Sequence, residues 1–375
     1  MIQLAHDAKR RRLGPFNPVI AAALALLPAC AGQLIMVAAA RYGVVSEWAK
    51  RYILPLFANI GSIASRAPFA VAPWLALVFL LWIIIGLAVS AARSIYHANA
   101  AYAVASAIHR AAALSALYFL FVIGFGVMYQ APRTFAAQSV SGFPYARYLR
   151  RPLSEASENW IRLANILNRR AIARNAVSMD AESVTESIAA SILEQIPAMF
   201  ERANAAIGSG MAIRAPKPSG LNGLLGSLMV EGIYVPFTGE ALVNTDAPLI
   251  DIPFVACHEA AHSIGFARED EANLVALIVC GMSDNPLFRY SGAMSALRYS
   301  LTRLCREDMA EYNRLVSLMS DNVRSDFYRR NAYWGAKRGS SAAVFANHLN
   351  DIFLSYAAMQ ENGVASYEAV LDFAR

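Results

Sequence analysis

Charged residues are scarce in this sequence. Lys, Arg, Asp and Glu make up only 16% of the 375 residues, whereas hydrophobic residues make up 57% and the mean hydropathy is +0.38. Soluble globular proteins carry about 25% charged residues. The shortage of charge therefore excludes an ordinary soluble protein over the whole length and favours a substantial membrane portion.

Cysteine is also rare, and no two cysteines are close in sequence. The four residues, Cys30, Cys257, Cys280 and Cys305, contain no C-x-x-C pair, which argues against a thiolate zinc site and a disulfide framework. Cys257 and Cys280 could form one bridge in an oxidising compartment, but free buried thiols are the favoured interpretation.

The net charge of +6 comes from basic residues without aromatic interleaving, so no nucleic-acid partner is predicted.

Three long apolar runs are present in the N-terminal third of the chain. They cover residues 18–40, 68–92 and 111–130, and each is long enough to cross a bilayer as a helix. The third run ends beside Tyr129, a residue type that membrane interfaces favour. Residues 1–130 are therefore predicted to form a transmembrane region of three helices.

The first run has a second interpretation, because "LPAC" at 27–30 resembles the sequence before a lipid-modified cysteine and suggests a cleaved signal peptide. The apolar run continues past Cys30, so we interpret it as an anchor. The cluster "KRRR" at 9–12 outweighs the basic residues of the loops and favours a cytoplasmic N-terminus. Three crossings then place residues 131–375 outside the cytoplasm.

The rest of the chain has a mainly helical pattern. Apolar residues repeat every three or four positions after Ser154 and again after Ser178, which predicts amphipathic helices. A Gly/Pro-rich break at 208–227 precedes residues 228–246, where β-branched and aromatic residues flank Thr238-Gly239. This pattern predicts a small pair of strands.

The sequence "HEAAH" at 258–262 is the strongest indication of chemistry. On a helix, His258 and His262 lie on the same face, where two ring nitrogens can reach a single zinc ion. Glu259 lies one step around the helix and can take a proton from an ion-activated water, as in metalloproteases with the H-E-x-x-H motif. Burying such groups in an apolar segment without a metal or partners would be costly, which argues against an ordinary helix face.

A catalytic zinc ion needs a third protein ligand. Gly265 is placed to end the helix in a left-handed cap, and a second helix beginning near Glu269 or Asp270 would bring its first turn back toward the histidines. Glu271 is the preferred third ligand, and Glu269 is the alternative. Asp270 or Asn273 is a candidate for orienting a ligand histidine.

Other families with this motif fit less well. Arg268 occupies the position of the third histidine of metzincin proteases, and an arginine cannot bind zinc. Intramembrane proteases carry the motif within a span, but the apolar stretch at 272–282 is too short to cross a bilayer. In thermolysin-like gluzincins the third ligand is a glutamate on a following helix, commonly followed by Ala, which "EAN" at 271–273 resembles.

Nearly the whole chain resembles the bacterial membrane family called domain of unknown function 3810, regarded as candidate zinc metallopeptidases. The resemblance rests on the apolar N-terminal runs and on the segments "VPFTGEALVNTDAP", "PFVACHEAAHSIGFAREDEAN", "FRYSGAMSAL" and "NGVASYEAVLD". It implies a mainly α protein of the bacterial inner membrane. Three transmembrane helices would precede a mostly helical, zincin-like domain over residues 131–375 with a small β-hairpin or sheet.

The resemblance also suggests residues for substrate binding. In many zincins an edge strand before the metal helix pairs with an extended peptide, so Glu240 would line the cleft. Tyr290 or Arg289 would then be a candidate for stabilising the oxyanion of a tetrahedral intermediate.

The sequence thus predicts a membrane-anchored zinc metallopeptidase. Zn²⁺ would be held by His258, His262 and Glu271, with Glu259 as general base and a peptide or protein as substrate. The alternative hypothesis is a non-catalytic zinc-binding membrane receptor or scaffold that binds peptides. The sequence does not indicate the oligomeric state.

Overall fold

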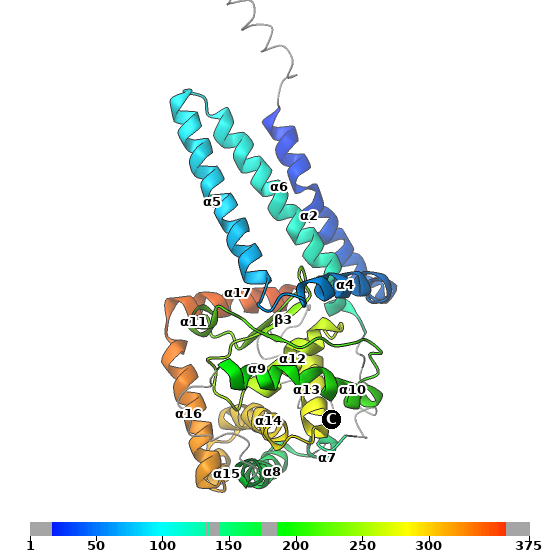
Figure 1. Ribbon diagram of the computed structural model, residues 1–375, viewed down its shortest axis with the longest axis vertical. Helices are drawn as coiled ribbons and strands as arrows, with labels where there is room; N and C mark the ends of the chain where they lie inside the picture. The colour runs from blue at the N-terminus through cyan, green and yellow to red at the C-terminus, as the bar shows by residue number, and fades with distance from the viewer. Residues whose placement is uncertain (1–16, 133, 135–142, 150, 174–185, 358–375) are drawn as a thin grey trace, which may run out of the picture. The chain divides into compact units, whose positions relative to one another are not determined.

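The computed structural model describes residues 17–132, 134, 143–149, 151–173 and 186–357, which are mainly helical (Figure 1). Three of its helices are long and apolar enough to cross a membrane: α2 (Pro18–Arg41), α5 (Ala72–Tyr96) and α6 (Ala101–Gly124). The first agrees closely with the predicted run at 18–40, and the second lies four residues later than the run at 68–92. These helices support association with a membrane.

The third predicted run, 111–130, is displaced from α6. The helix already begins at Ala101, and Arg110 lies within it. Its guanidinium donates hydrogen bonds to the carbonyl oxygens of Ile83 and Ser106, so the charge does not interrupt the helix. The helix ends at Gly124, and η2, a 3-10 helix over Gly126–Gln130, follows. Tyr129 therefore belongs to η2 and does not end a span.

The described residues belong to two compact units. The first consists of the described residues up to Ala38 together with Trp74–Ile123, and the second consists of Ala39–Pro73 and the described residues from Gly124 onward. This division differs from the predicted boundary at residue 130, because the segment between α2 and α5 belongs with the second unit. That segment forms one continuous helix made of α3 (Gly43–Trp48), the π-helix η1 (Ala49–Ile53) and α4 (Leu54–Ala64).

The remaining helices all lie in the second unit. They are α7 (Ala146–Leu149), α8 (Leu153–Ala173), α9 (Glu186–Glu194), α10 (Ile196–Ile207), α11 (Asn222–Ser227), α12 (Ile252–Ser263), α13 (Glu269–Met282), α14 (Pro286–Glu307), α15 (Met309–Val316), α16 (Asp321–Arg338) and α17 (Ser341–Ala357). The helix predicted after Ser154 is α8. The helix predicted after Ser178 is divided at Gln195, because Pro197 fits the first turn of a helix but not its interior; residues 178–185 lie outside the described residues.

A small sheet in the second unit confirms the predicted strand pair. β2 (Gly232–Val235) and β3 (Glu240–Val243) are antiparallel, and Gly239 has a φ of +62° in the turn between them. β1 (Lys217–Pro218) adds to the other side of β3 in the parallel direction, giving the order β1-β3-β2. The sequence did not predict β1, because it has only two residues within a Gly/Pro-rich break. β2 therefore lies at an edge of the sheet.

The core of the second unit is built on α13. Every residue of this helix from Glu269 to Gly281 is buried, and it packs between α12, α14 and α10. This packing confirms that residues 272–282 form a core helix. Cys257 of α12 and Cys280 of α13 meet there as free thiols with 3.9 Å between their sulfur atoms, in agreement with the favoured interpretation.

Asp251, directly before α12, ties this helix to α16. Its carboxylate accepts hydrogen bonds from Arg330 Nε at 2.7 Å and from Trp334 Nε1 at 3.0 Å, and Arg330 also pairs with Glu231 at 2.6 Å. Asp251 and Arg330 are both buried. This network of buried, largely desolvated charges therefore fixes the start of α12.

Replacing Asp251 with Ala is expected to lower the free energy of unfolding by about 3 kcal/mol, the low end of the cost of breaking a buried ion pair, because Glu231 still faces the guanidinium. Asp284→Ala is the matched control, since it removes the exposed ion-pair partner of Arg202 and should cost about 0–1 kcal/mol. Denaturant unfolding of the detergent-solubilised chain measures both. Equally small losses in the two variants would contradict this role of Asp251.

Candidate metal centre

α12 and α13 form the helical reversal that the sequence predicted. α12 ends at Ser263, Gly265 has a φ of +95°, and α13 begins at Glu269. A side chain at Gly265 would also collide with its surroundings, because a Cβ atom there would lie 2.7 Å from Leu54 Cδ2. Both the backbone conformation and the close contact therefore require glycine at the turn.

The reversal brings three ligand-type atoms together. His258 Nε2 lies 3.0 Å from His262 Nε2 and 3.1 Å from Glu269 Oε2, and His262 Nε2 lies 3.7 Å from the same oxygen. All three residues are buried. They are the one group of His, Cys, Asp or Glu residues with metal-ligand spacing among the residues that the structure describes.

The outward-facing nitrogens of both rings have hydrogen-bond partners. His262 Nδ1 lies 2.7 Å from the Phe266 carbonyl oxygen, and His258 Nδ1 lies 2.9 Å from Asn273 Oδ1. Both partners are acceptors, so each Nδ1 atom donates a proton outward and each Nε2 atom faces the cluster. Tyr299 also donates to Asn273 Oδ1 at 3.2 Å. Asn273 thus has the orienting position that the sequence analysis considered.

Burial and the neighbouring charges act in opposite directions on this cluster. Burial lowers the pKa of His262, but the Glu269 carboxylate, followed by Glu259, raises it to about 9. Burial raises the pKa of Glu269, but His262 and His258 outweigh it and hold the pKa of this carboxyl well below its usual range. The surrounding charges therefore favour a positive charge at the centre of the cluster.

Glu259 lies on α12 beside His258, and its side chain packs against the edge strand β2. It is buried, and its carboxylate accepts a hydrogen bond from the backbone N–H of Tyr234. Burial raises the pKa of Glu259, while the imidazoles of His258 and His262 partly oppose this effect. Gly232 makes room for the side chain, because a Cβ atom there would lie 2.8 Å from Glu259 Oε1.

Glu271 does not join the cluster, contrary to the preference in the sequence analysis. Its Oε1 accepts a hydrogen bond from the Thr134 backbone N–H at 2.6 Å. Residues two positions apart on a helix are separated by about 200° of rotation, because the helix has 3.6 residues per turn. Glu269 and Glu271 therefore cannot both face the histidines. The structure places the alternative candidate, Glu269, beside the two rings.

A family model described as "Protein of unknown function (DUF3810)" matches residues 50–374. The chain belongs to this family. No curated protein and no solved structure matches the chain. The match covers all of the cluster residues, but the description of the DUF3810 family carries no activity, so the function must be argued from the site.

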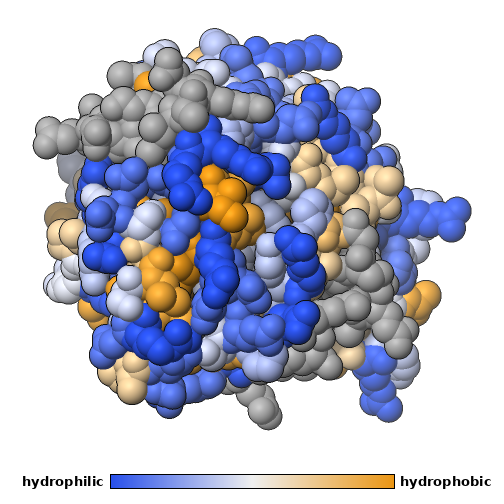
Figure 2. All heavy atoms as spheres, turned by 90° about the horizontal axis from the view of Figure 1, so that it is seen from below, coloured by the Kyte–Doolittle hydropathy of each residue, from blue (hydrophilic) through white to orange (hydrophobic). Residues whose placement is uncertain are grey.

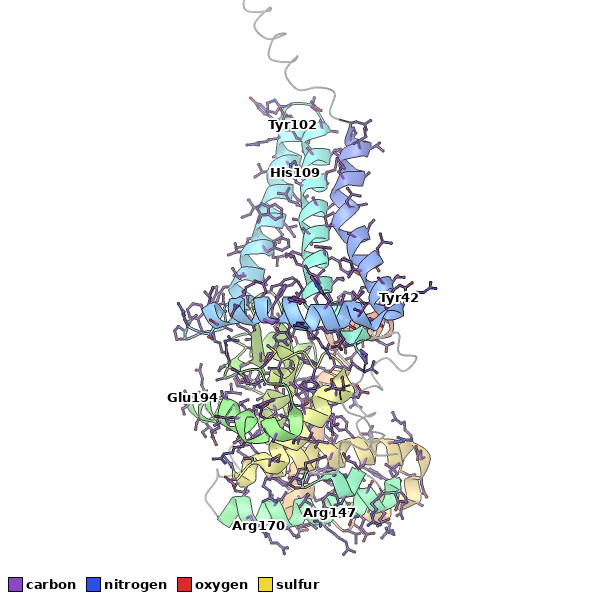
Figure 3. All side chains as sticks on the ribbon, turned by 90° about the vertical axis from the view of Figure 1, so that its right-hand side faces the viewer. Tyr42, Tyr102, His109, Arg147, Arg170 and Glu194 are labelled. Atoms are coloured by element: carbon purple, nitrogen blue, oxygen red, sulfur yellow. The ribbon has the colours of Figure 1, made fainter. Side chains whose placement is uncertain are left out.

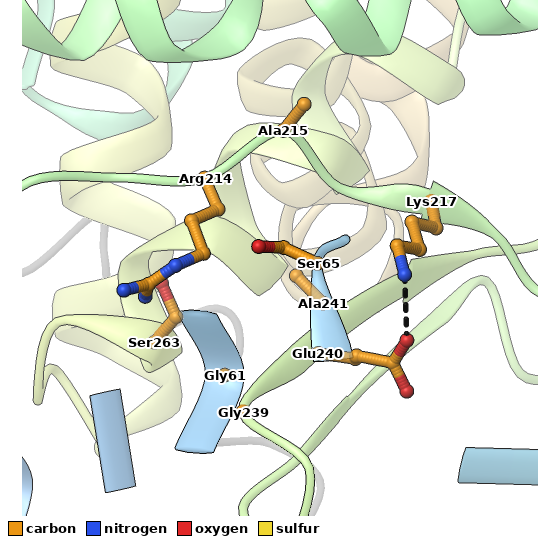
Figure 4. Close-up of a pocket in the computed structure, with 9 residues that line it drawn as sticks. All are labelled: Gly61, Ser65, Arg214, Ala215, Lys217, Gly239, Glu240, Ala241 and Ser263. Atoms are coloured by element: carbon orange, nitrogen blue, oxygen red, sulfur yellow. Dashed lines mark hydrogen bonds and ion pairs between the residues drawn. The ribbon is translucent and has the colours of Figure 1, made fainter. Parts of the chain in front are cut away.

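In this DUF3810 member, Glu240 lies on β3 and lines a small pocket. Its carboxylate accepts hydrogen bonds from the backbone N–H groups of Val71 and Ala72 at 2.8–3.1 Å and pairs with Lys217 Nζ at 3.0 Å. Figure 4 shows this pair beside a small pocket, with Arg214 on the pocket's other side near Ser263. These contacts connect Glu240 on β3 to the first residue of α5 and to the residue before it.

Tyr290 has a hydrogen-bond partner on another helix of the second unit. Its side chain is fully buried, and its hydroxyl donates a hydrogen bond to Asp326 Oδ2 at 2.8 Å. Asn168 donates to the same oxygen at 3.2 Å. Tyr290 therefore links α14 to α16, and α8 joins the same carboxylate through Asn168.

Two aromatic residues at the cluster were missed by the sequence analysis. The Tyr129 hydroxyl donates to Glu269 Oε1 at 3.3 Å, and the Phe125 ring lies edge-on to the His262 ring with 5.7 Å between centroids. Both come from the segment after α6, far before the motif in the sequence. The sequence carries no local signal for this contact, because Tyr129 ends an apolar run and resembles an interface residue.

Proposed function

We propose that this protein is a membrane-anchored, zinc-dependent peptidase in which His258, His262 and Glu269 hold the ion. The observation that carries the proposal is the convergence of two imidazole Nε2 atoms and one carboxylate oxygen in a buried position. Three such acceptor atoms repel one another unless a proton or a cation lies among them.

The spacing of these atoms fits a tetrahedral ion. Ligand atoms about 2.0–2.1 Å from such an ion lie about 3.3–3.4 Å from one another, and the three measured separations are 3.0, 3.1 and 3.7 Å. The outer hydrogen bonds of both rings have the arrangement that fixes ligand histidines in metal sites. Two histidines and one glutamate are also the ligand set of many catalytic zinc sites.

Bound Zn²⁺ would act as a Lewis acid, lowering the pKa of water and polarising a carbonyl group. Glu259 would take the proton from the attacking water on a carboxylate oxygen and return it to the leaving nitrogen of the peptide. Burial of Glu259 supports this role, because the raised pKa makes the carboxylate a better proton acceptor. The backbone N–H of Tyr234 holds the carboxylate in place.

The edge strand β2 supports a peptide as substrate. Among the described residues β2 pairs with β3 on one side, and we propose that an extended peptide adds to its other side, next to Glu259. Ile233 on this strand is 43% exposed, and Tyr234, the next residue, bonds to Glu259. A peptide paired with β2 would therefore lie next to the proposed base. Three crossings and a basic N-terminal cluster would place this site outside the cytoplasm.

Removal of the metal is the direct test of the proposal. The purified full chain is expected to contain about one zinc ion per molecule, to cleave members of a broad peptide library, and to lose both properties on treatment with a chelator. Added Zn²⁺ should restore cleavage, because the ligand side chains are held in place by the fold. Elemental analysis and mass spectrometry of the digest measure the two properties.

The same assay separates the alternative function. Zinc without cleavage products, together with peptide binding, would indicate the receptor or scaffold hypothesis. Absence of zinc from protein supplied with the metal, in a chain that remains folded, would contradict both hypotheses.

A further inference from the structure

The continuous helix formed by α3, η1 and α4 exposes an apolar stripe. Its six side chains recur every three or four residues, and each is at least 38% exposed: Val44, Trp48, Tyr52, Leu56, Ile60 and Ile63. We propose that this stripe, called the 44–63 stripe below, docks on the headgroup region of a lipid bilayer, with the helix lying in the membrane surface. The proposal depends on the membrane association of the apolar helices and is independent of the peptidase proposal.

The π-helix keeps the stripe on one side of the helix. In a regular α-helix each step of four residues turns about 40° too far, so the four steps from Val44 to Ile60 would drift by about 160°. The π-helical turn at Ala49–Ile53 accommodates about one extra residue and removes about 100° of this drift. The apolar side chains therefore form a nearly straight band instead of winding around the helix.

The opposite face of the helix is fixed to the second unit. Leu54, Phe57 and Gly61 are buried there. Gly61 and Gly239 approach so closely that a Cβ atom on Gly239 would lie 2.7 Å from Gly61 Cα, and Leu54 packs against Gly265 in the turn of the candidate metal centre. The helix thus connects the exposed stripe directly to the turn between α12 and α13.

The side chains along the stripe have the composition of a membrane interface. The Trp48 and Tyr52 rings are in contact, with 5.7 Å between centroids, and the Arg51 guanidinium lies 5.6 Å from the centre of the Tyr52 ring. Tyr42, labelled in Figure 3 at the start of the helix, has Arg41 over its ring at 5.7 Å. Aromatic and basic residues together are enriched where membrane helices meet the headgroups.

The position of the helix in the chain identifies the bilayer as the partner. It follows α2, which ends at Arg41, and precedes α5, which begins at Ala72. If both apolar helices cross the membrane, the segment between them is held at one membrane face from both ends. Contact between its apolar side chains and the headgroup boundary would then require no further loss of association entropy, because the segment is already tethered there.

A second exposed apolar stripe, on α17, supports the proposal that this side of the second unit faces the bilayer. On α17 the exposed apolar side chains are Val344, Phe345, Leu349 and Ile352. α17 and α3 both contact η2, which directly follows α6 in the chain, and α4 and α17 lie along one edge of the second unit (Figure 1). The end of the unit that carries α8 and α15 is mostly hydrophilic, with smaller hydrophobic patches (Figure 2).

Spin labels on the full chain test the proposal. Single cysteines replace Leu56 and Phe345 on the two stripes, and Ile166→Cys on α8 is the matched control, because Ile166 is an apolar residue with 40% exposure. Cys30 and Cys305 are replaced by Ser in all variants, and the chain without an added cysteine gives the background of the buried thiols. The proteins are reconstituted in vesicles of phosphatidylethanolamine and phosphatidylglycerol.

Power-saturation EPR then compares the accessibility of each label to oxygen, which concentrates in the bilayer, and to a water-soluble nickel chelate. We expect oxygen to dominate at positions 56 and 345 and nickel to dominate at position 166. Dominance of nickel at position 56 would place the 44–63 stripe in water and overturn the proposal. Low accessibility to both reagents with dipolar broadening would show that a second copy of the chain covers the stripe, which also overturns it.

Discussion

Glu259→Gln is expected to lower kcat/KM for peptide cleavage by about 10²–10⁴-fold, the usual contribution of a general base, while zinc remains bound at the parent level. Gln has nearly the same shape and keeps an oxygen that can accept the Tyr234 backbone N–H, but it cannot take a proton from water at neutral pH. Because Glu259 is not one of the three cluster residues, the metal content should not change. Peptide cleavage rates and elemental analysis of the same preparation give both quantities.

Glu271→Gln is the matched control for this variant. It changes another buried glutamate of the second unit, and it keeps an acceptor for the Thr134 backbone N–H. Its cleavage rate and zinc content should both stay close to those of the parent. Cleavage by the Glu259 variant at the parent rate would rule out Glu259 as the base, even if zinc is present.

Glu269→Ala is expected to weaken zinc binding by more than about 100-fold, because loss of an outer hydrogen-bond partner of a ligand alone costs about 10–100-fold. The two histidines would remain as the only protein ligands within the cluster. Peptide cleavage should fall with the zinc content. Competition with a chromophoric chelator measures the affinity, and the thermal unfolding of both metal-free proteins shows whether the fold is intact.

Glu271→Ala separates Glu269 from the residue that the sequence favoured. This variant loses the contact with Thr134 but none of the three converging atoms, so its zinc affinity should stay within a few-fold of the parent value. Tight zinc binding in the Glu269 variant and its loss in the Glu271 variant would reverse the assignment and return Glu271 to the ligand set.

The two proposals depend on separate observations. Leu54 links the turn at Gly265 to the helix of the 44–63 stripe, whereas the peptidase proposal depends on the three converging atoms. Loss of cleavage with an unchanged EPR pattern, or the reverse, would show which of the two fails.

The local parts of the site could be predicted from the sequence because they depend on helix geometry alone. His258 and His262 share a face wherever residues four apart lie on an α-helix, and Gly265 marks the reversal because glycine tolerates a positive φ. The strand pair around Gly239 was also predictable, since its turn and its β-branched residues are adjacent in sequence. The three apolar helices followed from length and composition.

The choice between Glu269 and Glu271 could not be made in this way. It depends on the rotation of α13 about its axis, and a helix that is buried on every side has no polar face from which that rotation could be read. Tyr129 was missed for a related reason: its contact with Glu269 spans 140 positions in the sequence. Only the packing of η2 against the turn brings the two together.

The sequence by itself therefore determined that two imidazoles and an acid lie together on one helix, that the chain reverses after them, and that three apolar helices precede them. These features follow from interactions between neighbours in the chain. The tertiary structure alone decided which glutamate lies beside the two imidazoles, which partners Glu240 and Tyr290 bond to, and that residues 39–73 belong with the second unit. Each of these depends on contacts between segments far apart in sequence, and local residue patterns do not encode such contacts.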